Sequence, residues 1–265
     1  MPAPADTESR DGGQPFLQVI GVSVQFGGIH ALTDIELEAP VGRVTGLIGP
    51  NGAGKTTAFN VITGLQEPTS GRVVLDGHDV NRLAPHRRAR LGIARTFQRL
   101  EVFGSLSAYD NILAAAEFRK GWSGDKTSPR DVAREIVARV GLEAVVGARV
   151  DALPTGLARL VELGRALATR PRLLLLDEVG SGLSREETES LGRLMTELAE
   201  EGMGILLVEH DVELVMRVCG HIYVLDFGRA IASGTPAEVQ RDPAVQAAYL
   251  GAEHPTLNAA AEAAS

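Results

Sequence analysis

The sequence lacks three features whose absence narrows the class of protein. It contains one cysteine, Cys219, so it has no internal disulfide framework, which fits a reducing compartment and predicts a packed thiol. No apolar run approaches the roughly 18 to 20 residues that span a bilayer, and the start lacks the basic-then-apolar order of a signal peptide. The net charge of −8 argues against general nucleic-acid affinity, because phosphates require a basic face. We therefore expect a cytoplasmic protein that does not bind nucleic acid.

Hydrophobic residues are plentiful, at 44% of 265 residues, and suffice for a buried core. Short β-rich runs fill the start of the chain, helical periodicity follows, and after residue 170 apolar strands alternate with helices. This alternation is typical of a parallel sheet covered on both faces, so we predict an α/β fold over residues 16–251. The Pro-, Gly- or Ala-rich ends, residues 1–15 and 252–265, show no apolar periodicity and are expected to be disordered tails.

The segment GPNGAGKT, residues 49–56, has the spacing of a phosphate-binding loop and lies between an apolar strand and a helix. Its glycines let backbone N–H groups surround an anion, and the helix dipole adds positive potential. Lys55 would reach the terminal phosphates, and the Thr56 hydroxyl could ligate magnesium. The competing interpretation is a glycine-rich turn that happens to contain lysine. The residues predicted to contact ATP here are Gly49, Pro50, Asn51, Gly52, Ala53, Gly54, Lys55, Thr56 and Thr57.

Acidic and histidine side chains end two further apolar runs. LLLLDE, residues 173–178, places Asp177 to hold magnesium and Glu178 to act as the general base toward water. GILLV ends in Glu209 and His210, and a histidine at the carboxyl edge of a neighbouring parallel strand would face the same crevice. His210 is therefore a candidate γ-phosphate sensor. The alternatives are solvated strand ends and a surface histidine.

These motifs, with Gln98 in ARTFQ between them, make the chain resemble an ABC-type ATPase, the nucleotide-binding subunit of an ATP-binding-cassette transporter. The resemblance covers nearly all of residues 16–251. It implies the P-loop NTPase fold of that family: a parallel core sheet, an N-terminal antiparallel β subdomain and an inserted helical subdomain at about residues 99–168. It also implies that ATP and Mg²⁺ are the cofactors, and that the partners are permease subunits and a second ATPase subunit.

The resemblance assigns roles to two more residues. Phe26 in VSVQFGGIHAL matches the family's aromatic residue that stacks on adenine, although a core phenylalanine is the alternative. Gln98 matches the glutamine that contacts magnesium or the attacking water and senses the membrane partner. The following segment, RLEVFGSLSAYDNI, would form part of the surface that receives the permease. The protein would then be peripheral on the inner face of the membrane.

Within the family, four segments are most similar to the subgroup that serves branched-chain amino acid importers. They are ARTFQRLEVF, LLVEHDVELVM, VLDFGRAIASGTPAEV and DPAVQAAYLG. Relatives in this subgroup also move other amino acids, ureas or lipid-like cargo, and the ATPase subunit does not itself touch the cargo. The resemblance therefore implies a branched-chain amino acid or a related small solute as cargo.

The segment ALPTGLARLVELGRAL occupies the position of the family's signature loop, which closes over the partner subunit's γ-phosphate. Here Pro154 replaces serine and Leu157 replaces glutamine, while Thr155 and Gly156 remain as hydroxyl and backbone donors. Losing the serine hydroxyl removes a hydrogen bond worth about 1.5–3 kcal/mol to a charged group. We interpret 154–156 as a weakened trans-acting phosphate clamp, and a simple turn is the alternative.

Two neighbouring positions also depart from the family pattern. Ser184 stands where the family's D-loop ends in aspartate, and Val179 replaces a common proline. The first change would loosen coupling between the two sites of the dimer, and the second is mild. The cis ATP site retains its motif residues, so a partner ATPase subunit with a normal signature loop would restore one complete site.

The leading prediction is therefore an ATP-hydrolysing subunit that energises a membrane transporter. A regulatory subunit that binds ATP but hydrolyses it weakly, and a soluble ABC protein without a transport role, are the alternatives. A phosphate-loop kinase would need an acceptor site that no segment offers. The basic run HRRAR, residues 86–90, is expected to be a solvated helix face because the chain is acidic.

Overall fold

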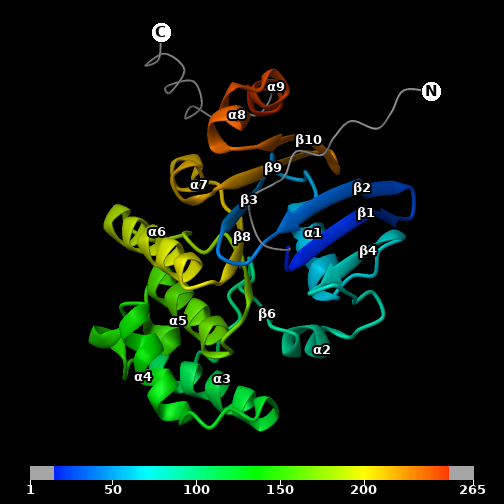
Figure 1. The fold of residues 1–265 in the computed structure, drawn as a ribbon. Helices are drawn as coiled ribbons and strands as arrows, with labels where there is room; N and C mark the ends of the chain where they lie inside the picture. The colour runs from blue at the N-terminus through cyan, green and yellow to red at the C-terminus, as the bar shows by residue number, and fades with distance from the viewer. Residues whose placement is uncertain (1–14, 251–265) are drawn as a thin grey trace, which may run out of the picture.

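The computed structural model describes residues 15–250, in which two β-sheets lie beside a group of helices (Figure 1). The expected disordered tails fall almost wholly outside these residues. No helix in the described part of the chain has the length and apolar character needed to cross a bilayer.

The first sheet is antiparallel and has the strand order β2-β1-β4-β5. Its strands are β1 (Leu17–Phe26), β2 (Ile29–Ala39), β4 (Ser70–Leu75) and β5 (His78–Asp79). Alternate residues of β1 are buried, as expected for a sheet with one face on the core. This sheet brings the tip of the β1–β2 hairpin toward the loop that follows β3.

The second sheet has the order β10-β9-β3-β8-β7-β6. Its strands are β3 (Val44–Ile48), β6 (Ile93–Arg95), β7 (Leu173–Asp177), β8 (Gly204–Val208), β9 (His221–Asp226) and β10 (Arg229–Gly234). All neighbours pair in parallel except β9 and β10, which form an antiparallel edge. Strands β3, β7 and β8 are buried at every position, which confirms the prediction made from their continuous apolar runs. Their carboxyl ends therefore meet at one edge of the sheet.

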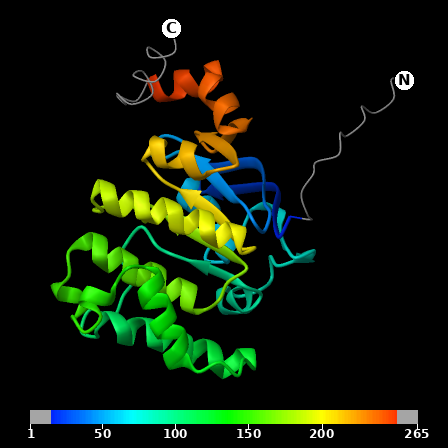
Figure 2. The same ribbon diagram turned by 60° about the vertical axis from the view of Figure 1, so that its left-hand side comes forward.

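Nine α-helices are assigned within residues 15–250. They are α1 (Lys55–Thr63), α2 (Pro85–Arg90), α3 (Ala108–Ser123), α4 (Pro129–Arg139), α5 (Thr155–Ala168), α6 (Arg185–Glu200), α7 (Val212–Val218), α8 (Pro236–Arg241) and α9 (Pro243–Leu250). Helices α3, α4 and α5 pack on one another and form the green group in Figures 1 and 2. Two 3₁₀ turns, Glu143–Val145 and Val150–Ala152, connect α4 to α5.

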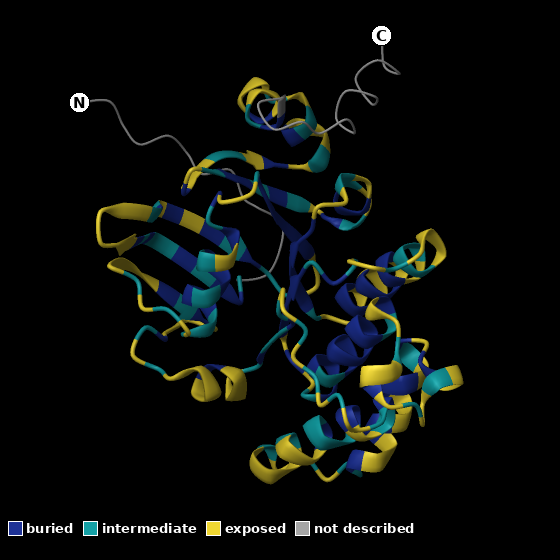
Figure 3. Cartoon of the chain, turned by 180° about the vertical axis from the view of Figure 1, so that it is seen from behind, coloured by how far each residue is buried: buried dark blue, intermediate teal, exposed yellow. Residues whose placement is uncertain are grey.

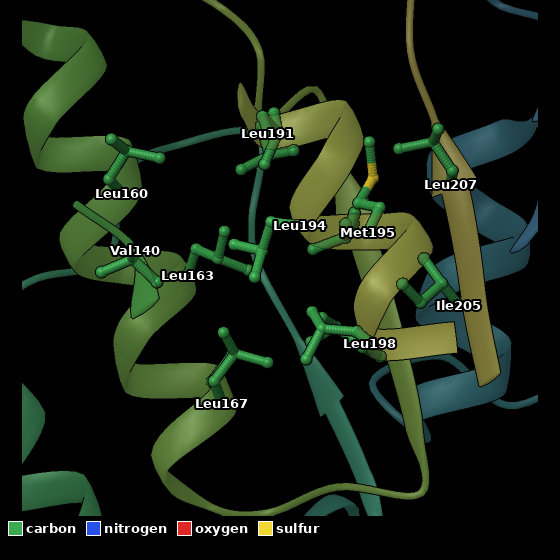
Figure 4. Packing of buried hydrophobic residues seen from close by; sticks show 14 of the residues in the cluster. Val140, Leu160, Leu163, Leu167, Leu191, Leu194, Met195, Leu198, Ile205 and Leu207 are labelled. Carbon is green, nitrogen blue, oxygen red and sulfur yellow. The ribbon is translucent and has the colours of Figure 1, made fainter. Parts of the chain in front are cut away.

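Helix α6 joins this helical group to the second sheet. In Figure 4, Leu194 of α6 points toward Leu163 of α5, while Leu198 lies toward Ile205 of β8. All these side chains belong to one buried cluster, and each buried leucine contributes about 1.5–3 kcal/mol relative to an exposed one. Figure 3 shows that the central strands are buried and that the helices expose their outer faces. Movement of α5 is therefore coupled through packing to the sheet that carries the site.

The other four residues of HRRAR are exposed, as expected for a solvated helix face, but Arg88 corrects this interpretation at one position. Its side chain is 1% exposed and donates hydrogen bonds to the carbonyls of Val61 at 2.7 Å and Ile62 at 3.0 Å. These carbonyls lie at the end of α1, where helices leave acceptors without intrahelical partners. Gly64, the residue after α1, has a φ of 80°, and a Cβ there would lie 2.7 Å from the Arg88 Nε. Glycine therefore fits this position. One arginine of the run is thus a buried cap.

The single cysteine gives the outcome of a smaller expectation. Cys219 is buried, with its Sγ 3.1 Å from where a Cβ on Gly46 would lie, and burial raises its pKa to about 12. It is a packed thiol, as predicted. Ser128 is the N-cap of α4, and its side chain makes no capping hydrogen bond.

Candidate functional site

The loop between β3 and α1 is shaped by glycines that no other residue could replace. A Cβ on Gly49 would lie 2.1 Å from the carbonyl oxygen of Leu225, and one on Gly54 would lie 2.7 Å from that of Ala31. Gly54 is left-handed, with φ 105°, and offers α1 no side-chain cap. The first N–H groups of the helix therefore point into the loop without a side-chain acceptor, which is the arrangement that favours a bound anion.

Lys55 is buried and its ammonium lies inside the loop. It donates to the carbonyls of Gly49 at 2.7 Å and Pro50 at 2.9 Å. Burial lowers the pKa of Lys55, while the nearby Glu178 and Asp177 carboxylates oppose that shift. The strand-end acids and the phosphate loop are thus brought together, as their positions in the sequence predicted. Thr56 next to the lysine is exposed.

Asp177 ends β7 in a buried ion pair with Arg95, at 2.9 Å. Its backbone N–H donates to the Thr96 hydroxyl at 3.0 Å, and Arg95 also donates to the Asn60 side chain at 2.7 Å. Burial raises the pKa of Asp177, and the hydrogen bond from Arg95 opposes that rise. The sequence reasoning did not identify Arg95 or Thr96. Their position at the end of β6, the parallel neighbour of β7, is the signal that could have revealed them.

Glu178 is the meeting point of three chain segments. Its Oε1 accepts a hydrogen bond from His210 Nε2 at 2.7 Å, and Gln98 Nε2 lies 3.5 Å from the same oxygen. Glu178 has a φ of 54°, which is left-handed for a residue with a Cβ, and its N–H donates to the Val208 carbonyl at 2.9 Å. Strain of this kind is held only where surrounding contacts enforce it and is concentrated at functional sites. A carboxylate between a histidine and an amide can orient and deprotonate a water molecule.

Glu209 holds the loop that follows Glu178. It is 8% exposed and accepts a hydrogen bond from the Gly180 N–H at 2.7 Å. Burial is the main cause that raises the pKa of Glu209. The sequence pattern gives Glu209 only as the residue before His210, and it does not predict this anchoring contact.

Phe26 lies at the exposed tip of the β1–β2 hairpin, with 49% of its surface accessible. This excludes the alternative of a core phenylalanine. The hairpin reaches the phosphate loop through Ala31, whose carbonyl lies against Gly54. The turn between β9 and β10 also contacts this loop, because the Gly228 N–H donates to the Ala53 carbonyl at 3.0 Å. An exposed aromatic ring on this hairpin is available for a flat ligand.

The loop before α5 differs in construction from the cis residues. Pro154 is the N-cap of α5 and provides no side-chain hydrogen bond, and Pro154 and Thr155 are both exposed. Gly156 is buried against the next loop, where an added Cβ would lie 2.6 Å from the Gly182 carbonyl. Leu157 packs at the edge of the main core cluster. Pro154 and Thr155 are thus the exposed residues at the start of α5, and the serine and glutamine of the family pattern are absent.

Ser184 has a clear local role. It is the N-cap of α6 and forms a capping box with Glu187: its hydroxyl accepts from the Glu187 N–H at 3.3 Å, and its own N–H donates to Glu187 Oε2 at 2.7 Å. Val179 is fully buried in the main core cluster. Both replacements are therefore satisfied within this chain.

Tyr249 of α9 contacts the phosphate loop from behind. It is 8% exposed and lines a small cavity with Gly49, Pro50 and His210. Burial raises the pKa of Tyr249 to about 12, although a hydrogen bond with the backbone of Gly49 opposes that rise. The segment DPAVQAAYLG carries the family resemblance, but its sequence does not predict the contact of Tyr249 with the phosphate loop.

This fold and this loop define an ABC-type ATPase. The family model described as "ABC transporter" matches residues 32–181, and the model described as "Branched-chain amino acid ATP-binding cassette transporter" matches residues 231–255. The chain therefore belongs to the ATP-binding proteins of ABC transporters, in the branched-chain amino acid transporter family. Proteins of this class bind ATP, hydrolyse it and associate with permease components.

Individual relatives cover nearly the whole chain. The high-affinity branched-chain amino acid transport ATP-binding protein BraF of Pseudomonas aeruginosa is 37% identical over 251 residues, which are 90% of this chain and 98% of that protein. The lipopolysaccharide export system ATP-binding protein LptB of Escherichia coli is 34% identical over 226 residues, 85% of this chain and 93% of that protein. A crystal structure of a nucleotide-free ATP-binding cassette superposes with a TM-score of 0.80 at 29% identity and covers 89% of this chain and 99% of its own.

Proposed function

We propose that this chain is the ATP-hydrolysing subunit of an importer for branched-chain amino acids. The observation that carries the hydrolytic part is Glu178, whose carboxylate lies 2.7 Å from His210 and 3.5 Å from the Gln98 amide. The match of residues 231–255 to the branched-chain family supports the cargo. Purifying the native membrane complex and identifying its permease and solute-binding protein tests the cargo. Import of a labelled lipid or urea in place of leucine, isoleucine or valine would contradict it.

In this proposal residues 49–57 bind the triphosphate and Phe26 stacks on the adenine. The Thr56 hydroxyl, the Asp177 carboxylate and the Gln98 amide oxygen would hold Mg²⁺, which prefers such oxygen ligands. Among the described residues no group of three or more His, Cys, Asp or Glu could hold a metal ion. The three oxygen donors of Thr56, Asp177 and Gln98 would fit a magnesium ion that keeps waters and nucleotide oxygens as its remaining ligands. The ion would neutralise charge on the β- and γ-phosphates.

The remaining groups supply orientation and proton transfer. Glu178 accepts the proton of the attacking water, and the hydrogen bond from His210 fixes the direction of its carboxylate. His210 also faces the terminal phosphate. Gln98 completes the same side of the site. Positioned groups of this kind contribute about 10²–10⁴-fold to a rate.

The outward-facing turn at 154–156 is proposed to act on the nucleotide of a second subunit. Thr155 is exposed and offers its hydroxyl, and Gly156 would offer its backbone N–H although it is buried in the single chain, but Pro154 offers neither. A partner that carries a serine at this position would complete the nucleotide site of this chain, while this chain would leave the partner's site weakened. Separate turnover measurements on homodimer and heterodimer test this. Equal, brisk hydrolysis by the pure homodimer would remove the reason for a distinct partner.

A groove of about 770 Å³ between α2, α3 and the segment after Gln98 is the proposed permease surface. Phe103, Phe118 and Trp122 line it and remain 44%, 71% and 38% exposed. Phe118→Ala should lower the ratio of permease-stimulated to basal turnover and weaken copurification. Lys126→Ala, on an exposed loop, is the matched control. Unchanged stimulation would place the permease elsewhere.

A regulatory subunit with weak hydrolysis is the second candidate, because Pro154 and Leu157 weaken the trans clamp. Single-turnover measurement with trapped nucleotide separates the two functions. Hydrolysis as slow as in Glu178→Gln would support the regulatory role.

A further inference from the structure

Helix α5 carries a buried ion pair one turn inside its outward-facing end. Arg159 and Glu162 are 7% and 4% exposed, and Arg159 donates to Glu162 Oε2 at 3.0 Å. A buried pair gains little net stability, because desolvation of both charges offsets their attraction. The role of the pair is therefore indicated by the other groups that the two side chains bind.

Both side chains bind the backbone of the segment that carries Gln98. Glu162 Oε1 accepts from the N–H groups of Phe97 at 3.1 Å and Glu101 at 3.3 Å. The two terminal nitrogens of Arg159 donate to the carbonyls of Phe97 and Gln98. The peptide groups on both sides of Gln98 are thus attached to α5. We call Arg159 and Glu162 the α5 bracket.

The attachment matters because the contact of Gln98 with Glu178 is at the limit of hydrogen-bond length. The Gln98 Nε2 lies 3.5 Å from Glu178 Oε1, so a shift of a few tenths of an ångström makes or breaks it. Gln98 itself is exposed, and its side chain makes no other hydrogen bond with the described residues. The α5 bracket holds the backbone from which the Gln98 amide extends.

The same helix begins at the proposed trans clamp. Its first turn includes Gly156, which packs against the Gly182 carbonyl so closely that a Cβ would lie 2.6 Å away. A displacement of the first turn of α5, when a partner closes on it, therefore reaches Arg159 about one turn further along. Rigid packed elements transmit such displacements rather than absorbing them.

We propose that Arg159 and Glu162 are positioning residues that set the distance between Gln98 and Glu178 and make that distance follow the position of α5. The inference rests on the proposed role of Gln98 in hydrolysis. It adds that the clamp facing the partner and the glutamine of the same subunit are connected by a backbone-binding ion pair. The pair does not touch the nucleotide, so it acts on turnover through Gln98 rather than on affinity.

The test is a double-mutant cycle on the purified full chain. Gln98→Ala, Arg159→Ala and the double variant are compared for kcat, KM for MgATP and fluorescent-nucleotide affinity. Each single variant should lower kcat about tenfold, since a misplacement of about 1 Å costs up to about 10²-fold. The double variant should be no slower than the slower single variant, and nucleotide affinity should stay within about twofold. Additive losses of kcat, or a loss of affinity alone, would overturn the proposal.

Conservative variants keep the test valid if Arg159→Ala does not fold. Glu162→Gln retains an oxygen for the Phe97 and Glu101 N–H groups but weakens the ion pair, so its loss of kcat should be smaller and should also vanish in the Gln98→Ala background. Arg134→Ala, which removes an exposed arginine paired with Asp131, is the matched control. A normal kcat for Gln98→Ala alone would instead overturn the role of Gln98, and the bracket with it. No hydrolysis by the unaltered protein or its heterodimer would contradict the proposed function itself.

Discussion

The residues proposed to bind and hydrolyse the cis nucleotide and those proposed to reach the partner's nucleotide are held by the chain in different ways. Three of the cis side chains lie close to the ends of buried strands and are held by hydrogen bonds: Lys55 to two carbonyls, Asp177 to Arg95 and Glu178 to His210. Among the trans residues, Pro154 and Thr155 lie at the start of α5 and are exposed. Ser184 lies at the start of α6.

The difference follows from what each half must do. A cis site that assembles within one chain can be fixed before the nucleotide arrives, which lowers the cost of organising it. The trans half is completed only when a second subunit docks, so its groups stay solvated in the single chain. In this proposal, a change such as Pro154 acts mainly on the partner's site.

The strongest way to break the cis half is Glu178→Gln. The amide has the same shape but cannot take a proton, so kcat should fall by about 10²–10⁴-fold while nucleotide binding persists. Turnover and fluorescent-nucleotide binding measure the two effects. Glu189→Gln on α6 is the control, and a loss of less than about fivefold in Glu178→Gln would assign the general base elsewhere.

Removing the loop cation should be the next largest effect. Lys55→Ala loses a buried ammonium that would donate to charged phosphate oxygens, each such bond being worth about 1.5–3 kcal/mol, so affinity should fall by about 10²-fold or more. Equilibrium nucleotide binding measures it, with Lys126→Ala as the surface control. Affinity within about threefold of the unaltered protein would contradict the assigned loop.

The cis half was the part that sequence reasoning could predict, because its signals are local. The loop at 49–56 needs a fixed spacing between a strand and a helix, and Glu178 and His210 directly follow apolar runs. The parallel second sheet was predicted from its continuous apolar runs, whereas the antiparallel first sheet was implied by the family resemblance, and the antiparallel β9–β10 edge was not predicted. The limits given for the helical subdomain, about residues 99–168, remain a prediction.

Contacts between distant segments could not be predicted. The pairing of Arg95 with Asp177 depends on β6 lying beside β7, and the burial of Arg88 depends on α2 packing under the end of α1. A run of basic residues gives no sign of which member turns inward until the neighbouring helix is placed. The backing of the phosphate loop by Tyr249 likewise requires α9 to fold back over β3.

The trans half can be sharpened by restoring what it lacks. Pro154→Ser should raise homodimer turnover about tenfold, because a hydroxyl donor returns to the position proposed to face the partner's phosphate. Serine at this N-cap also stabilises α5 by about 1 kcal/mol, so turnover is compared per folded molecule. Pro154→Ala, which restores no donor, is the matched control. A fall in turnover for the serine variant would show that the turn does not act as a clamp.

The smallest expected effect concerns Ser184, where the trans and local roles can be separated. Ser184→Ala removes the cap of α6 and should cost about 1 kcal/mol, or about 2–4 °C in Tm. Ser184→Asp keeps the capping geometry, so its Tm should match the unaltered protein, and only dimer-dependent turnover should change. Because the capping box with Glu187 places two carboxylates close together in that variant, its Tm is measured at two salt concentrations. If Ser184→Asp restores steeper dependence of turnover on protein concentration at unchanged Tm, the serine weakens coupling across the dimer. If both variants change only Tm, position 184 serves this chain alone, and the difference between the two halves is confined to the turn at Pro154.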